Sequence, residues 1–417
     1  MRSRLRIGIC LLSAALSFTA VGSASADMVT YWNVVATTAA TAPIVGGVPQ
    51  SRIDAMTHAA IHDALNAIDP RYRPYAFDVQ ADPNASPAAA VAAAAHDVLV
   101  HEVPAIQQPF LDAAYASALS GIPAGAAKDS GIAVGKAAAA AIIALRSADG
   151  SQAPMPYTPG SGPGVWIPTP PGFLPAAVPG WGKVTPFALR SGEQFRLKPP
   201  KYFDLTSEAY TANYDEVKSI GDVNSTLRTA VQSEIARFWY EPSVQGWNRI
   251  ARIISARHDL DLWENARLFT LLNFALADGY IAHFDTKYFY NFWRPVTAIR
   301  AGDTDGNDNT VADPDWTPYL VTPNIPDYPS GHSTVGAAAA VVLDRFFTHG
   351  ELPFTTTSGD PYPGLTRSFP TFWDAALENA DSRVFAGIHF RSAVEDGLRL
   401  GERVGRFVST HTLKPGQ

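Results

Sequence analysis

Lys287-Tyr-Phe-Tyr-Asn-Phe-Trp-Arg294-Pro295 is the most informative stretch of this 417-residue chain. Its two cations are seven positions apart, about two helix turns, so one continuous helix would project both from nearly the same face. Most residues between them are aromatic, and burying two cations among aromatic rings is costly unless an anion compensates for their charge. Read alone, the stretch also fits an amphipathic helix with a surface Arg and a Lys whose stem lies along apolar surface.

A second segment, Pro329-Ser330-Gly331-His332, precedes a helical pattern over residues 335–347. A turn at the start of a helix offers free backbone N–H groups and the positive end of the helix dipole. A hydroxyl, a glycine N–H and an imidazole could therefore converge on one anion. Read alone, the segment is also compatible with an ordinary helix cap beside an exposed histidine.

A third segment holds Arg383 and His389, which are six positions apart. On one straight helix these side chains would point roughly 120° apart, so the helix must break between them if both reach one ligand. Gly387 is the natural place for that break, although a capping Arg and a core His also fit. Three fixed cations, two histidines and a helix start together suit a tetrahedral or trigonal-bipyramidal oxyanion such as phosphate or vanadate.

The order and spacing of the three segments resemble the signature of the vanadium-dependent haloperoxidase and acid phosphatase (type 2 phosphatidic acid phosphatase) superfamily. That signature runs Lys, six residues, Arg-Pro; then Pro-Ser-Gly-His; then Ser-Arg, five residues, His, three residues, Asp. The specific resemblance covers residues 285–400. Two further stretches, Met56–Ala64 and Phe292–Arg300, are similar to the bacterial secreted haloperoxidase-like branch.

The resemblance implies a role for each motif residue. His389 would bond the central atom, either as the axial ligand of vanadium or as the nucleophile that forms a phosphohistidine. His332 would be the acid–base group on the opposite side. The implied cofactor is vanadate, with phosphate able to occupy the same site, and its oxygens would be held by Lys287, Arg294, Ser330, Gly331 and Arg383.

One position departs from the signature, because Ala393 stands where the family has Asp four residues after the histidine. In the phosphatases that carboxylate orients the imidazole and raises its basicity. Glu395 and Asp396 are close in sequence, but Asp396 lies a turn too far along a helix for an obvious direct contact. The departure weakens the case for phosphoryl transfer and leaves vanadate binding open if another acceptor orients the ring.

The N-terminus has the pattern of a secretory signal. Basic residues within 2–6 precede the short apolar stretch Ile7–Val21, and Ala24-Ser25-Ala26 is a small-residue cleavage site. We therefore expect residues 1–26 to be removed and the mature protein to be secreted or periplasmic. The single cysteine, Cys10, lies inside this signal, so the mature chain has no thiol chemistry and no disulfide.

Charge and hydropathy exclude two classes of partner. The formal net charge is −7 with a pI near 5.8, and no basic stripe stands out, which argues against nucleic acid. No later apolar segment is long enough to predict a membrane span. The expected partners are small molecules, namely hydrogen peroxide and halide or a phosphate ester, and the oligomeric state is left open.

The predicted fold class is all-α, with helix bundles forming one compact unit over residues 27–417. We expect helices at 52–68, 88–103, 126–145, 261–285, 335–347 and 394–408, and another capped by Ser225 with Leu227, Val231, Ile235 and Phe238 on one face. Three parts are predicted within this domain: N-terminal helices at 27–146, a Pro/Gly-rich excursion at 147–202, and a catalytic helical half at 203–417. The excursion should be ordered because its aromatic rings should pack: Trp166, Phe173, Trp181 and Phe187.

Two other patterns are weaker candidates for metal binding. His58 and His62 have the i, i+4 spacing of a metal pair, with Asp63 adjacent, although such a pair in an alanine-rich helix more often packs. Residues 303–308 are similar to a calcium loop, but the glycine comes too early and no Glu closes the loop. A solvated turn is the preferred interpretation of that segment.

The sequence thus predicts an enzyme that oxidises halide with hydrogen peroxide on bound vanadate. An acid phosphatase that uses the same residues through a phosphohistidine is the first alternative. A non-catalytic oxyanion-binding protein is the second.

Overall fold

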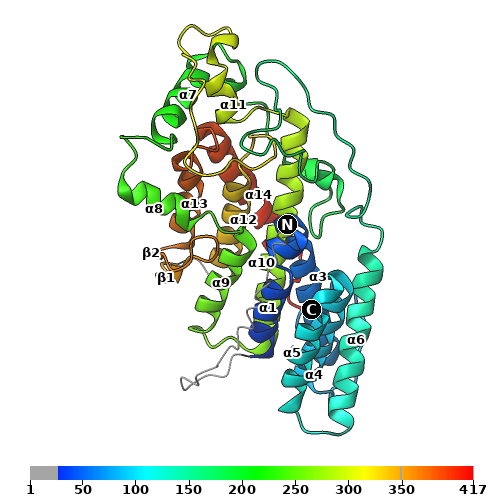
Figure 1. Ribbon diagram of the computed structural model, residues 1–417. Helices are drawn as coiled ribbons and strands as arrows, with labels where there is room; N and C mark the ends of the chain where they lie inside the picture. Colours follow the sequence, from blue (N-terminus) through cyan, green and yellow to red (C-terminus); the bar gives the residue numbers. More distant parts are fainter. Residues whose placement is uncertain (1–26, 348–349, 417) are drawn as a thin grey trace, which may run out of the picture.

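The computed structural model describes residues 27–347 and 350–416; the predicted signal at 1–26 lies outside them. The described chain is mostly helical, which confirms the predicted fold class (Figure 1). The helices and strands are α1 (Met28–Ala39), α2 (Ala42–Val45), α3 (Gly47–Ile68), α4 (Pro87–Glu102), η1 (Ala105–Gln107), α5 (Gln108–Ser120), α6 (Ala126–Arg146), η2 (Trp181–Lys183), η3 (Gly192–Phe195), η4 (Lys201–Phe203), α7 (Glu208–Ile220), α8 (Ala230–Phe238), α9 (Ser243–Ser255), α10 (Leu262–Tyr290), α11 (Pro295–Arg300), η5 (Gly302–Thr304), α12 (Gly331–Phe346), β1 (Phe354–Thr357), β2 (Thr366–Phe369), α13 (Phe372–Phe385) and α14 (Arg391–His411).

The N-terminal helices form a bundle in which α4 packs against α3, α5 and α6 (Figure 1). Alanine dominates α4, and its buried alanines are fully excluded from solvent. Small side chains let the axes approach closely, as at Gly135 of α6, where an added Cβ would lie 2.2 Å from the carbonyl oxygen of Ala90.

Helix α10 is the central element, because it contacts α3 in the N-terminal bundle as well as α12 and α14. Its start is fixed by a reciprocal capping box between Asp261 and Glu264. It ends at Tyr290, five residues beyond the predicted end, where Asn291 adopts a left-handed conformation with φ of 52°. This helix therefore links the two halves and carries Lys287 in its last turn.

Helices α12 and α14 lie against each other along a stripe of small residues. A Cβ added to Gly401 of α14 would lie 2.0 Å from the carbonyl oxygen of Thr334, and one added to Gly405 would lie 2.5 Å from that of Ala338. Only glycine allows this approach. The N-termini of both helices thereby come to the same end of the pair, where Ser330 caps α12.

A small antiparallel hairpin, β1 with β2, is the one sheet of the described residues. No strand was expected from the sequence. Each strand has only four residues, too few to show a clear alternation of buried and exposed positions.

The predicted cap at Ser225 is wrong. Helix α8 begins after Thr229, which forms a capping box with Gln232. Leu227 and Val231, expected on a buried face, are 67% and 58% exposed. Ser225 Oγ instead caps a turn by accepting the N–H groups of Leu227 and Arg228, and the reciprocal Thr-x-x-Gln pair starts the helix.

The Pro/Gly-rich excursion runs over the helices in an ordered path. Trp166, Trp181 and Phe187 are buried as expected, whereas Phe173 is 63% exposed, so the expectation that every ring packs is wrong. The carboxylate of Asp278 in α10 anchors the excursion by accepting the backbone N–H groups of residues 187–189.

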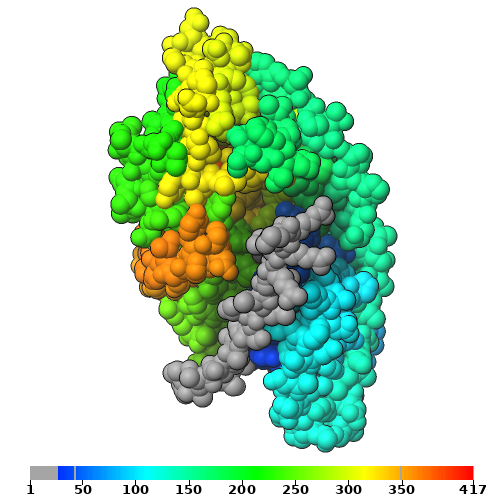
Figure 2. Space-filling view, viewed as in Figure 1, coloured from blue at the N-terminus to red at the C-terminus, as the bar shows by residue number. Residues whose placement is uncertain are grey.

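The excursion also lies beside the segment near residue 320, as the adjoining green and yellow surfaces in Figure 2 show. Ala177 N–H donates to the Asn324 carbonyl at 3.0 Å, and the Asn324 side chain donates to the Pro175 carbonyl at 2.6 Å. Among the described residues, no helix is long and apolar enough to cross a membrane.

Candidate anion-binding site

Lys287 and Arg294 do not share a helix face, so the prediction of one continuous helix is wrong. Helix α10 stops at Tyr290, and the left-handed Asn291 turns the chain before Arg294, which is the N-cap of α11. Pro295 at the first position of α11 favours this new start, because its missing N–H would be unpaired there in any case.

The turn nevertheless brings both cations to one short segment, residues 325–327. Lys287 Nζ donates to the carbonyls of Pro326 at 2.7 Å and Asp327 at 2.8 Å. Arg294 Nε donates to the carbonyl of Ile325 at 2.7 Å. Both side chains are fully buried. Carbonyls orient both side chains, and Arg294 Nη1 also lies 3.9 Å from Asp327 Oδ1. Burial, and then the charge of Arg294, lower the pKa of Lys287 well below its usual value, so a bound anion would favour its charged form.

The excursion braces the turn that separates the two cations. Trp166 N–H donates to the Asn291 carbonyl at 2.9 Å, and Trp293 N–H donates to the Gly164 carbonyl at 3.0 Å. The long irregular segment thus helps to position Arg294.

Two guanidinium groups keep buried donors that lack partners. Among the described residues, Arg294 Nη2 and Arg383 Nε have no hydrogen-bond partner, although the residues are only 0% and 2% exposed. Arg383 Nη1 makes a long bond of 3.4 Å to the Trp239 carbonyl. Leaving a charged donor unpaired in the interior is destabilising by more than about 1 kcal/mol. An oxyanion between them would satisfy such donors, so these residues fit the anion that the sequence predicts.

His389 is oriented by a carboxylate that sequence reasoning missed. Its Nδ1–H donates to Asp327 Oδ1 at 2.8 Å, and its Nε2 accepts from Arg294 Nη1 at 3.1 Å. This network places the lone pair on Nε2, where Arg294 Nη1 donates to it. Once released from Arg294, that nitrogen could bind a metal or attack a phosphoryl group. No residue pattern signals Asp327, which precedes the Pro-Ser-Gly-His segment and reaches the ring only through the fold.

The shifted pKa values of this pair follow from burial. Burial raises the pKa of Asp327 to about 7, against the opposing effect of Arg294 and Lys287. Burial also lowers the pKa of His389 well below its usual value, and the positive charges of Arg294 and Lys287 lower it further. His389 is therefore neutral at physiological pH, as expected for an imidazole among fixed cations.

Asp396 does not substitute for the carboxylate missing at Ala393. Its Oδ2 accepts from the Tyr328 hydroxyl at 2.8 Å. The Ala393 carbonyl accepts the Ser330 N–H at 2.8 Å, so this position ties the start of α14 to the start of α12. Asp327, from another segment, is the other acceptor that orients the ring of His389.

Helix α12 begins at Gly331, four residues earlier than the predicted start at 335. The Ser330 side chain caps it: Oγ accepts from Ser333 N at 3.4 Å and from Ser333 Oγ at 2.9 Å. The Ser330 hydroxyl proton is thus left to donate elsewhere. The Gly331 N–H belongs to the first turn, whose N–H groups have no partner within the helix.

His332 stands in the first turn of α12 with a fixed tautomer. Its Nε2–H donates to the Glu241 carbonyl at 3.2 Å, which leaves a lone pair on Nδ1. Burial lowers its pKa well below the usual value, and the charge of Arg383 lowers it further. His332 also contributes to the lowered pKa of His389, so the two imidazoles lie in one electrostatic field.

The fold brings the predicted site residues to one region. Lys287 and Arg294 meet at residues 325–327, Arg294 bonds His389, and Ser330 is tied to the start of α14. The chain breaks between Arg383 and His389 as expected, with Gly387 at φ of 76° between α13 and α14.

His58 and His62 both bond other side chains of the fold. Within residues 27–347 and 350–416, no group of three or more His, Cys, Asp or Glu side chains could hold a metal ion. His58 Nε2 accepts from Asn33 at 2.9 Å and its ring stacks on Phe269, whereas His62 Nδ1 bonds Asp63 at 3.1 Å. The packing interpretation of the pair is therefore preferred.

The 303–308 segment is a turn with four exposed residues, as expected, but two of its side chains are buried. Asp305 and Asn307 are 7% and 8% exposed. Asp305 accepts from the Thr310 hydroxyl at 2.8 Å, and Asn307 donates to the Leu205 carbonyl at 2.7 Å. Asn307 also donates to the Thr211 hydroxyl of α7 at 2.9 Å, so the loop is tied to that helix.

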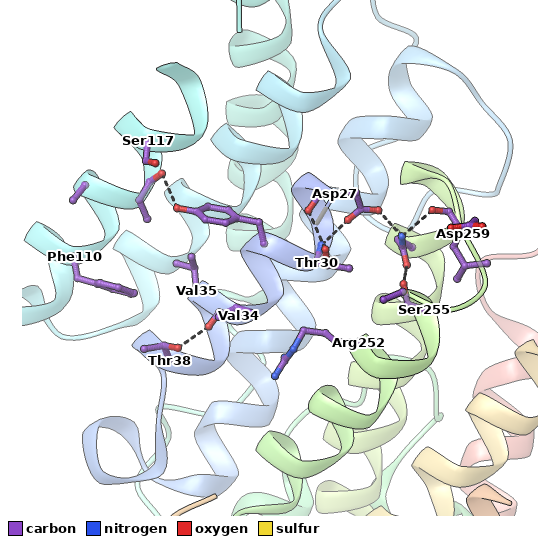
Figure 3. A pocket seen from close by; sticks show the side chains of 16 residues that line it. Asp27, Thr30, Val34, Val35, Thr38, Phe110, Ser117, Arg252, Ser255 and Asp259 are labelled. Atoms are coloured by element: carbon purple, nitrogen blue, oxygen red, sulfur yellow. Dashed lines mark hydrogen bonds between the residues drawn. The ribbon is translucent and has the colours of Figure 1, made fainter. Parts of the chain in front are cut away.

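A separate cavity of about 570 Å³ lies between α1, α5 and α9. Figure 3 shows Val34, Phe110 and Arg252 around it, each from a different one of these helices. None of the predicted anion-site residues lines it, so it is distinct from the site on α10, α12 and α14.

Comparison with known proteins agrees with this geometry. A family model described as the second helical-bundle domain of VCPO matches residues 267–415. Vanadium chloroperoxidase from Curvularia inaequalis is 27% identical over 281 residues. That match covers 51% of this chain and 45% of the relative, so the chain spans about half the length of that curated protein.

Solved structures extend the likeness to nearly the whole chain. The structure described as the first bacterial vanadium-dependent iodoperoxidase has a TM-score of 0.79 and 28% identity, covering 92% of this chain and 96% of that one. A holo-type bacterial vanadium-dependent chloroperoxidase, 19% identical, shares the fold with a TM-score of 0.74 over 92% and 96% of the two chains. The motif signature, the family model over residues 267–415 and the shared fold make this chain similar to the vanadium-dependent haloperoxidases.

Proposed function

We propose that this protein is a vanadate-dependent haloperoxidase that oxidises halide with hydrogen peroxide. The observation that carries the proposal is the pair of unpaired buried donors, Arg294 Nη2 and Arg383 Nε, together with the ring of His389, which Asp327 orients through Nδ1. A site with one nitrogen ligand and several buried cations suits an oxyanion whose central atom accepts an electron pair. The named relatives, an iodoperoxidase and chloroperoxidases, support the same reaction class.

In this proposal, the residues divide into a ligand and a set of oxygen donors. His389 Nε2 would bond the vanadium, with Asp327 holding the ring through Nδ1. Bound vanadate would supply the electrophilic centre that activates hydrogen peroxide toward halide. Its oxygens would be held by Lys287, Arg294, Ser330, Gly331 and Arg383.

His332 would move the proton that the reaction needs. Halide, hydrogen peroxide and one proton give hypohalous acid and water, so a group in the pocket must accept and release protons. The neutral imidazole of His332, with its Nδ1 lone pair, can take a proton from hydrogen peroxide and return it to the departing oxygen.

One observation favours a second candidate, the acid phosphatase. A phosphohistidine route needs a carboxylate behind the nucleophilic ring, and the Asp327–His389 bond has that arrangement. Phosphate-ester hydrolysis is therefore the reaction to measure beside halide oxidation.

The two activities are separable in one experiment. Protein stripped of vanadate is assayed for oxidation of iodide and bromide by hydrogen peroxide while orthovanadate is added, and for hydrolysis of p-nitrophenyl phosphate without it. We expect vanadate-dependent oxidation and no comparable hydrolysis. Arg383→Ala should abolish the oxidation, while Arg406→Ala, which removes an exposed cation of α14, should leave it unchanged. Hydrolysis that orthovanadate inhibits, without oxidation, would favour the phosphatase; vanadate binding without either activity would favour a non-catalytic anion-binding protein.

We also propose that the protein acts outside the cytoplasm, in the periplasm or the medium. The support is the signal pattern of residues 1–26. N-terminal sequencing of the exported protein should give Asp27 as the first residue; retention of residues 1–26 on a cytoplasmic product would contradict the proposal.

A further inference from the structure

A third histidine, His283, lies next to the proposed anion site. It is in α10 one helix turn before Lys287, and only 1% of it is exposed. Its Nδ1–H donates to the Gly279 carbonyl at 3.1 Å. That bond fixes the tautomer and leaves Nε2 as a hydrogen-bond acceptor.

The Nε2 edge of this ring faces the start of α12. A Cβ added to Gly331 would lie 2.9 Å from Nε2, closer than to either neighbouring ring carbon, at 3.3 and 3.4 Å. Among the described residues, Nε2 has no hydrogen-bond partner. The Nε2 acceptor thus lies beside Gly331, the residue whose N–H is proposed to hold the anion.

The electrostatic surroundings of His283 are those of the same site. Burial lowers its pKa well below the usual value, and the charge of Lys287 lowers it further. Its other titratable neighbours include His332 and Arg294. The ring is therefore neutral, and Nε2 cannot serve as a donor to an anion oxygen. An unpaired acceptor in an anion site is unfavourable unless the ligand brings a donor of its own.

We infer that His283 Nε2 accepts a hydrogen bond from a protonated oxygen of the bound oxyanion and thereby selects anions that carry a proton. The inference rests on the anion site of the proposed function. Vanadate and phosphate each carry at least one proton at neutral pH, whereas sulfate of the same shape carries none. Sulfate would place a lone pair against the lone pair of Nε2.

Charge alone predicts the opposite selectivity. Lys287, Arg294 and Arg383 should favour sulfate, which is fully dianionic, over phosphate, part of which is monoanionic at neutral pH. A preference for phosphate would therefore come from a hydrogen-bond acceptor and not from the cations.

The test compares inorganic phosphate with sulfate by titration calorimetry at neutral pH. Wild-type protein should bind phosphate at least about tenfold more tightly than sulfate, since an unpaired buried acceptor typically costs that much or more. His283→Leu, which has no acceptor, should lose most of this preference. His283→Gln, whose carbonyl oxygen can reach the place of Nε2, should keep much of it. Thermal unfolding without anion checks that each variant is folded.

The outcomes separate this inference from the proposed function. Phosphate that fails to bind the wild type would refute the anion site itself. Phosphate binding with equal affinity for sulfate, or with a preference unchanged in His283→Leu, would refute the role of His283 and leave the anion site standing. Equal wild-type affinities for phosphate and sulfate would refute the role of His283 even if His283→Leu does not fold.

Discussion

Asp327 accepts a hydrogen bond from His389 at 2.8 Å, although 62 residues separate the two in the chain. The carboxylate that the family signature places four residues after the histidine is thus supplied here from the segment before α12. The same segment offers its carbonyls to Lys287 and Arg294, so one stretch of backbone organises both the ligand and the cations.

Asp327→Asn should lower vanadate affinity and turnover by about 10- to 100-fold, because the amide cannot hold the ring as an ionised partner does. Asp396→Asn is the matched control, since that carboxylate lies close to His389 in sequence but bonds Tyr328. Calorimetry with orthovanadate and the halide assay measure the two effects. A greater loss in Asp396→Asn than in Asp327→Asn would contradict the assignment.

Substitution of the two histidines of the signature should affect vanadate binding and turnover differently. His389→Ala should abolish vanadate binding and turnover, since the remaining contacts are only electrostatic. His332→Ala should keep most of the binding and lower turnover by about 10²–10⁴-fold, the usual contribution of proton transfer. Binding and activity are measured on the same preparations. Equal loss of vanadate binding in both variants would refute this assignment of the ligand and acid–base roles. Loss of binding confined to His332→Ala would show that the two roles are reversed.

Gly401→Ala should destabilise the fold by about 1–3 kcal/mol or more, because the new methyl group would overlap the Thr334 carbonyl between α12 and α14. Vanadate affinity should fall as well, since both helices begin at the site. Gly121→Ala is the control, because an added Cβ there meets nothing within 4 Å. Urea unfolding compares the two; equal stability would show that the close approach is not required.

Asp54 of α3 should make stability depend on pH. Burial raises its pKa from 3.8 to about 8, so its protonated form is favoured in the fold. The stabilisation of the fold by the protonated Asp54 carboxyl is fully present below pH 3.8. It is lost as the pH rises through about 8, because the folded state must then bury a charge. Asp54→Asn should therefore become more stable relative to wild type between pH 5 and pH 8. Parallel unfolding midpoints across that range would contradict the raised pKa.

Local sequence signals predicted most of the helices. The alanine-rich pattern at 126–145 matches α6, and Ser330 caps α12 as a serine before Gly-His suggests. Local signals failed where two compete, as at Ser225 and Thr229, or where a single left-handed residue such as Asn291 ends a helix.

The candidate site was predictable in its motif residues but not in its partners. The spacing of Lys287, Arg294 and His389 can be read directly from the amino-acid sequence. The contacts of Asp327 and His283 depend on how distant segments meet, so no pattern in the sequence reveals them. His283 does stand four residues before Lys287, and helical spacing alone would have placed it near that cation.

Halide oxidation by vanadate-free protein, titrated with orthovanadate in the presence of hydrogen peroxide, tests the central claim most directly. We predict that the rate rises from near zero, saturates with orthovanadate, and falls when inorganic phosphate competes for the same site. A rate that stays near zero while calorimetry shows orthovanadate bound would contradict the haloperoxidase assignment.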